Sequence, residues 1–285
     1  MNAQAAILPG DRLHLSHGPI DLIIGADGAR DAAYRAAYTR FETVLTELMA
    51  ELPLLRQPVS TKPKGKIARR MYRAALAHAD GLTTPMICVA GAVAEEILAA
   101  MVDATDLTRA YINNGGDIAL HLTDGATFKV AVASPDGQNL GAVAITSTDP
   151  IRGIATSGQR GRSLSLGIAD AVTVLARSAS MADAAATRLG NAVDLPDHPA
   201  IKRGPANSLR DDTDLGAASV VTHVGTLSQT DVARALERGE TAASGMSAAR
   251  LIHGAALFLQ GQSRTVGLPE RMKHLTKDPH PCPTS

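Results

Sequence analysis

Apolar residues in the first third of the chain alternate with polar ones and then recur at helical spacing. Residues 12–15 and 20–24 alternate, which predicts the two strands of a hairpin. Over residues 29–52 apolar side chains recur every three or four positions, which predicts an amphipathic helix that ends at Pro53. Further helices are expected over 67–78, where the sequence is basic, and from Pro85 to about Met101.

The middle and last thirds change period and contain short β-branched or apolar runs separated by turns. The segments that predict strands are 110–113, 118–122, 128–133, 142–146, 169–177, 217–224 and 252–260. Helices are expected over 181–189 and 229–238, and the polar, proline-containing segment 196–216 predicts a long loop of the kind that often covers a binding site.

Strands grouped in runs favour an α+β fold over a strict βαβ alternation. We expect one mixed domain over residues 1–268, with sheets flanked by helices, followed by a Pro-rich tail over 269–285 that holds four prolines. The chain of 285 residues is long enough for such a domain to bury a core.

Composition narrows the classes of function. Lysine and arginine (28) balance aspartate and glutamate (28), and aromatic residues make up 2% of the chain with no tryptophan, which argues against a nucleic-acid partner. The longest apolar stretch, 86–102, is interrupted by Glu95 and Glu96, so no membrane span is expected. Two cysteines form no disulfide framework and no secretory signal is visible, which predicts a cytoplasmic protein.

The first candidate for chemistry follows a predicted strand and reads Asn113-Asn114-Gly115-Gly116-Asp117. Adjacent glycines allow positive φ and let a ligand approach the backbone N–H groups, while Asp117 adds a carboxylate at the rim. The alternative is an ordinary hairpin turn.

The second candidate is the segment 155–163, which contains Thr156, Ser157 and Gly158 followed by Arg160 and Arg162. Hydroxyls, glycines and two guanidiniums in one loop suit an anionic phosphate or carboxylate. The alternative is a solvated β-turn.

The third candidate lies on the helix expected over 181–189. Asp183 and Thr187 are four residues apart, so their oxygens project from one helix face, and oxygen ligands of this kind suit Mg²⁺. The alternative is that Asp183 caps its own helix or interacts with the helix dipole.

Taken together and in this order, these segments resemble the ApbE-like superfamily, whose founding members are FAD:protein FMN transferases. The resemblance covers roughly residues 85–193 and is carried by the Gly-rich helix start (89–95), the Gly-Gly-Asp turn (112–118), the Ala-Thr-Ser-Gly loop (155–158) and the strand that leads into Ala-Asp-Ala-Ala-Ala-Thr (172–187). The closer match is a branch of that superfamily known as an uncharacterised protein family. Its motifs correspond to residues 85–92, 114–118, 163–167 and 182–187.

The resemblance implies a mixed α+β fold with a flavin nucleotide site, FAD or FMN, and an adjacent Mg²⁺. It implies metal ligands at Asp183 and Thr187 and nucleotide contacts at residues 114–117 and 156–158. In the family's transferases a threonine of an acceptor protein attacks the FMN phosphorus of FAD and AMP leaves, while the metal neutralises the pyrophosphate.

The sequence departs from the family in two places. It has no histidine between Gly158 and Asp170, where the transferases carry one, and the usual lysine of the helix start falls at about Ala94. Arg160 or Arg162 is expected to replace the lost positive charge. FMN transfer is expected to be slow unless His198 or His223 reaches the pocket.

Three functions therefore follow from the sequence. The first is a Mg²⁺-dependent enzyme of the FMN-transferase type that binds a flavin or another anionic small molecule. The second is a hydrolase or ring-acting enzyme that uses the same pocket, with Ser157 or a metal-bound water as nucleophile. The third is a flavin- or metabolite-binding module without turnover. An alanine-rich core with few aromatic residues is also compatible with a homodimer.

Overall fold

A nine-stranded sheet forms the centre of the computed structural model, which describes residues 2–80, 83–133, 139–161, 163–211 and 213–268. The strands lie in the spatial order β1-β2-β3-β4-β5-β8-β9-β12-β13, and every pairing within the sheet is antiparallel. They are β1 (Gln4–Leu8), β2 (Arg12–His17), β3 (Ile20–Gly28), β4 (Leu107–Asn114), β5 (Asp117–Leu122), β8 (Gly153–Ser157), β9 (Ala171–Ala176), β12 (Gly254–Leu259) and β13 (Gln262–Val266).

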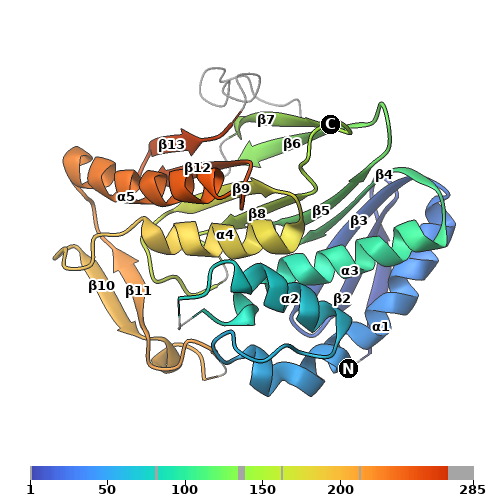
Figure 1. Ribbon diagram of the computed structural model, residues 1–285, viewed down its shortest axis with the longest axis horizontal. Helices are drawn as coiled ribbons and strands as arrows, with labels where there is room; N and C mark the ends of the chain where they lie inside the picture. Colours follow the sequence, from blue (N-terminus) through green and yellow to red (C-terminus); the bar gives the residue numbers. More distant parts are fainter. Residues whose placement is uncertain (1, 81–82, 134–138, 162, 212, 269–285) are drawn as a thin grey trace.

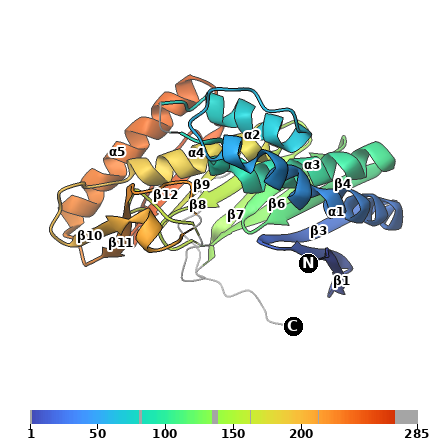
Figure 2. The same cartoon turned by 90° about the horizontal axis from the view of Figure 1, so that it is seen from below.

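Five α-helices of the described residues gather on one face of this sheet (Figures 1 and 2). They are α1 (Arg30–Leu55), α2 (Lys66–Leu76), α3 (Val89–Ala104), α4 (Ala179–Ala192) and α5 (Gln229–Ala248), and a short 3-10 helix, η1 (Pro85–Cys88), leads into α3. This arrangement confirms the mixed fold with a sheet flanked by helices that the sequence predicts.

Alternation along the strands separates two apolar layers. On β5, Ala119 faces the helices, whereas Leu120 and Leu122 face the opposite side. There they pack against the hairpin of β6 (Thr127–Ala133) and β7 (Asn139–Thr146). A second small hairpin pairs β10 (Ile201–Pro205) with β11 (Ser219–Val224), and η2 (Ala206–Ser208) follows β10.

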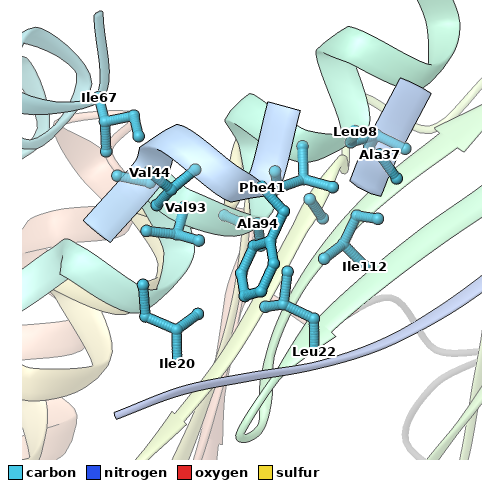
Figure 3. Packing of buried hydrophobic residues seen from close by; sticks show 14 of the residues in the cluster. Ile20, Leu22, Ala37, Phe41, Val44, Ile67, Val93, Ala94, Leu98 and Ile112 are labelled. Carbon is cyan, nitrogen blue, oxygen red and sulfur yellow. The ribbon is translucent and has the colours of Figure 1, made fainter. Parts of the chain in front are cut away.

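Helix α1 shows how the pattern of apolar residues produces the core. Ala33, Ala37, Phe41, Val44 and Leu48 are all buried at helical spacing. Phe41 is completely buried and lies over Leu22 of β3, as Figure 3 shows. Burial of this stripe fixes α1 on the sheet and, through α1, the position of α3.

The segment Pro85–Ala104 is long and apolar enough to cross a membrane by length and composition. In the fold it is a core helix, because α3 packs against α1, α4 and strands β4 and β5. Its two glutamates, Glu95 and Glu96, form ion pairs with arginines of neighbouring helices.

Several expected boundaries are wrong. Helix α1 continues past Pro53 to Leu55, whose side chain is fully buried, so burial outweighs the one backbone hydrogen bond that proline cannot donate. The segment 196–216 is not a continuous loop, since it contains β10 and η2. Residues 155–157 are the end of strand β8 rather than part of a loop. Finally, α5 extends to Ala248, ten residues beyond the expected end. The Pro-rich tail, 269–285, lies outside the described residues.

Candidate functional site

The first turn of α3 is the point where the first and third candidate segments meet. Asn114, at the end of β4, donates a hydrogen bond from Nδ2 to the carbonyl oxygen of Ala90 over 3.1 Å. Asp183 of α4 accepts one on Oδ2 from the backbone N–H of Gly91 over 3.0 Å. Both side chains are buried. The strand end and the helix are therefore tied to the same turn of backbone.

Helix α4 is held against α3 by a second set of contacts. Ser178 caps α4, and Glu95 of α3 accepts hydrogen bonds from the backbone N–H and the hydroxyl of Ser180 over 2.6 and 2.7 Å. Gly91 permits the close approach, because a Cβ on this residue would lie 2.4 Å from the carbonyl oxygen of Ala179. A glycine in one helix and alanines in the other thus set the separation of the two backbones.

Asp183 lies in an environment that disfavours its charged form. Burial raises the pKa of Asp183 well above its usual range, and the negative charge of Asp117 raises it further. The N–H groups of Gly91 and Ala90 act in the opposite direction and with less effect. Because Ser178 caps α4 and Asp183 bonds to α3, the alternative that Asp183 caps its own helix is wrong.

Thr187 lies one turn further along α4 and faces the same junction. Its Oγ1 donates a hydrogen bond to the carbonyl oxygen of Ile87 in η1 over 3.3 Å. Within the described part of the chain no three histidine, cysteine, aspartate or glutamate side chains gather as a metal site. A metal held here would therefore take oxygens from the two carboxylates, the Thr187 hydroxyl and the backbone.

The turn between β4 and β5 has the backbone geometry that its glycines suggest. Gly115 and Gly116 adopt φ of 66° and 113°, and the N–H of Gly116 donates to Oδ1 of Asn113 over 2.8 Å. Gly116 lines an apolar cavity of about 160 Å³ between the sheet and the β6–β7 hairpin. The cavity is also lined by Thr156 and Thr173, whose hydroxyls lie 2.9 Å apart.

Thr156 and Ser157 do not share one surface, although they are adjacent in the sequence. Thr156 borders the cavity on the hairpin side, whereas Ser157 turns toward α4, where a Cβ on Gly190 would lie 3.8 Å from its Oγ. Among the described residues no imidazole or carboxylate is within hydrogen-bond distance of Ser157 Oγ. Nothing in this part of the chain activates Ser157 as a nucleophile.

The expected sources of positive charge and of acid–base chemistry lie elsewhere. Arg160 is half exposed, and its Nε lies 3.1 Å from Oδ1 of the buried Asp170, while Arg162 lies outside the described residues. His198 pairs with Asp231 at the start of α5, and His223 is exposed on β11. Neither histidine is brought to Asp183.

The sequence does not predict the role of Gly91 and Glu95, although it does indicate that 89–95 begins a helix. The signal for that role is a glycine followed four residues later by a glutamate in an apolar helix. A partly buried glutamate in such a position needs a partner, and here the partners are the start of α4 and Arg70 of α2.

Replacing Asn114 by alanine removes the hydrogen bond that ties β4 to α3. We expect a loss of about 1–2 kcal/mol in the free energy of unfolding, since the partly buried carbonyl of Ala90 loses this donor. Urea unfolding followed by circular dichroism measures this change. Asn113→Ala, which removes a half-buried hydrogen bond of the turn, should lower the free energy of unfolding by less. An equal loss for both variants would show that the hydrogen bond from Asn114 to Ala90 adds no stability of its own.

The fold is shared with a solved flavin transferase. The flavin transferase ApbE from Vibrio cholerae superposes with a TM-score of 0.50 at 12% sequence identity, over 93% of this chain and 97% of that one. The described architecture is therefore a flavin-transferase-like fold.

The chain belongs to the family described as AbpE bacteria, whose model matches residues 5–265. A UPF0280 protein from Methanothrix thermoacetophila is 35% identical over 185 residues, which are 62% of this chain and 75% of that protein. UPF0280 proteins from Methanosarcina acetivorans and Archaeoglobus fulgidus are 38% and 37% identical over 45% of this chain, which spans about half of their lengths (49% and 51%).

Proposed function

We propose that this protein binds a flavin nucleotide together with Mg²⁺ and is an enzyme related to FMN transferases. The observation that carries the proposal is that Asp183 contacts the first turn of α3 and Thr187 contacts η1 just before it, with the charge of Asp117 close enough to raise the pKa of Asp183 and a Gly-Gly turn that borders an apolar cavity. A cytoplasmic location is part of the same proposal.

The residues present fit Mg²⁺. Asp183 is buried with Asp117 close enough to raise its pKa, so a divalent cation would offset a charge repulsion that the fold otherwise retains. Asp183 and Thr187 would hold the ion. When bound, the ion would neutralise negative charge on the nucleotide's phosphates.

The other residues would position the nucleotide. Glycine side chains do not shield the backbone of the Gly115-Gly116 turn, so a phosphate could approach it closely, and the Gly116 N–H would exchange its bond to Asn113 Oδ1 for one to a phosphate oxygen. The cavity is smaller than the roughly 300 Å³ typical of a whole ligand site, so it would receive one edge of the flavin ring. The Thr156 and Thr173 hydroxyls would hydrogen-bond to the polar edge of that ring.

Transfer to an acceptor protein is expected to be slow. A positioned acid or base contributes about 10²–10⁴-fold in rate, and the described site contains no histidine. The position of His198, paired with Asp231, supports this expectation.

The test measures binding and transfer separately. FAD is titrated into the protein with and without Mg²⁺ while flavin fluorescence is recorded, and covalent flavin on an acceptor peptide is measured by mass spectrometry. We expect FAD to bind more tightly with Mg²⁺. Thr187→Val should abolish the effect of Mg²⁺ and Thr187→Ser should retain it, because serine keeps the hydroxyl.

Binding that is absent, or equally tight without Mg²⁺, would contradict the proposal. Binding without any transfer would identify a flavin-binding module. Rapid transfer, unchanged by His198→Ala and His223→Ala, would show that the missing histidine does not limit the reaction.

A further inference from the structure

A quarter of the chain's positive charge is concentrated in one short segment. Residues 56–79 contain seven of its 28 lysines and arginines and no aspartate or glutamate, although the whole chain has no net charge. The segment includes α2, whose inner face is apolar and buried: Ile67, Ala68, Met71, Ala74 and Ala75. Packing of that face leaves the cations on the outer side of the helix.

These cations line a groove rather than a flat surface. Its volume is about 410 Å³, which lies within the range of small-molecule sites. Helix α2 forms one wall, and α1 and the second half of α3 form the others. The residues that line it are Arg40, Lys66, Arg69, Arg70, Arg73, Glu96, Ala99, Ala100 and Asp103.

The charges on the floor of the groove are neutralised by ion pairs. Glu96 is buried, and its two carboxylate oxygens accept hydrogen bonds from Nε of Arg40 and Nε of Arg70 over 3.0 and 3.1 Å. Arg40 also binds both oxygens of Glu47, and Arg70 binds Glu95. Two arginines are therefore fixed in place by carboxylates.

Arg69 and Arg73 differ from this pair. No carboxylate of the described residues lies within ion-pair distance of either guanidinium. They are four residues apart on one helix face, where like charges destabilise a helix, and Lys66 and Arg69 lie near the α2 N-terminus, where the helix dipole disfavours cations. Stability of the fold gives no reason for this arrangement, whereas an anionic ligand does.

We propose that the groove between α1, α2 and α3 binds a small organic phosphate with at least two phosphoryl groups, held by Arg69 and Arg73. One guanidinium can donate two parallel hydrogen bonds to the oxygens of a phosphate. Lys66 adds a third positive charge at the rim of the groove. The concave shape of the groove and the neutral charge of the whole chain favour a small ligand over a nucleic acid. The groove lies along the second half of α3, away from the first turn that Asp183 contacts, and so it is a second site.

The experiment uses pyrophosphate and ADP as probes in isothermal titration calorimetry with the full chain. In buffer without Mg²⁺, where the proposed flavin site lacks its cation, we expect saturable binding at one site per chain. Arg69→Gln and Arg73→Gln should each weaken it at least about tenfold, since each removes charge-assisted hydrogen bonds. Arg238→Ala, an exposed arginine on α5, should leave binding unchanged, and so should Asp183→Asn, which separates this groove from the flavin site. Circular dichroism confirms that each variant is folded.

Three results would overturn the proposal. They are equal binding of pyrophosphate by the wild-type protein and by the Arg69→Gln/Arg73→Gln double variant, equal affinity for citrate and pyrophosphate, and tighter binding of a 20-nucleotide RNA that pyrophosphate displaces. The first would place the site elsewhere. The second would remove the preference for phosphate, and the third would identify a nucleic-acid surface.

Discussion

Replacing Asp183 by asparagine is expected to stabilise the metal-free protein while abolishing its response to Mg²⁺. The amide can still accept the hydrogen bond from the Gly91 N–H, but it carries no charge to bury and none to repel Asp117. We expect a gain of about 1–3 kcal/mol at pH 8, or roughly 2–10 °C in melting temperature. Differential scanning fluorimetry with and without Mg²⁺ measures both effects.

The direction of the pKa shift determines how the stability gained by Asp183→Asn changes with pH. Burial, and then the charge of Asp117, raise the pKa of Asp183 in the folded state above that of the unfolded chain. Below a pH of about 4 the carboxyl is protonated in both states, so it costs no stability. As the pH rises, the unfolded chain ionises first, and the folded protein loses stability until the raised pKa is passed. The advantage of Asp183→Asn should therefore grow with pH above about 4.

Asp124, on an exposed turn, provides the matched control. Asp124→Asn should change the melting temperature little at any pH, because its carboxylate is exposed to solvent. If Asp183→Asn destabilised the metal-free protein at pH 8, the carboxylate would be stabilised by its surroundings. The inference of a cation site would then be wrong.

Gly91→Ala is expected to cost about 3 kcal/mol or more and to remove the Mg²⁺ response as well. The new methyl group would lie 2.4 Å from the carbonyl oxygen of Ala179, so α3 and α4 must move apart. That movement stretches the hydrogen bond from Gly91 to Asp183 and the contacts of Glu95 with Ser180. Urea unfolding gives the stability, and a Mg²⁺ titration of the melting temperature gives the response.

Gly245→Ala tests whether the effect comes from the contact or from the residue type. Gly245 lies in the last turn of α5, and a methyl group added to it would meet no atom of the described residues within 4 Å beyond the helix's own backbone. Alanine there should raise stability by about 0.5–1 kcal/mol. A similar small gain in stability for Gly91→Ala would show that α3 and α4 can accommodate a methyl group between them.

Much of the fold could be predicted because its elements carry their own periodicity. The hairpin of β2 and β3 and the helix α1 follow directly from alternation and from helical spacing. Strand β8 could not be predicted in this way. Its residues are small, and it forms a strand because β5 and β9 pair with it on either side. Similarly, Gly239 is typical of a helix end, yet it lies within α5, where a Cβ would be 2.4 Å from Val193 Cγ2.

The candidate site could be predicted as three segments but not as an arrangement. Asp183 and Thr187 do face one junction, and the Gly-Gly turn lies beside it. The separation of Thr156 from Ser157 could not be foreseen, since it depends on both residues belonging to a strand. The ion pair of Arg160 with Asp170 depends equally on tertiary contacts, because a sequence does not show which distant carboxylate an arginine will meet.

The order of strands in the sheet makes the protein modular. Strands β5 and β8 are neighbours although the β6–β7 hairpin lies between them in sequence, and β9 and β12 are neighbours although α4, the β10–β11 hairpin and α5 intervene. Each excursion returns to the strand beside the one it left. The β6–β7 hairpin supplies Val130, Ala131 and Val143 to the cavity wall, whereas Asp183 belongs to α4. The β6–β7 hairpin can therefore be replaced by a different one, which changes the shape of the cavity, while the strand order of the sheet and the position of Asp183 stay the same.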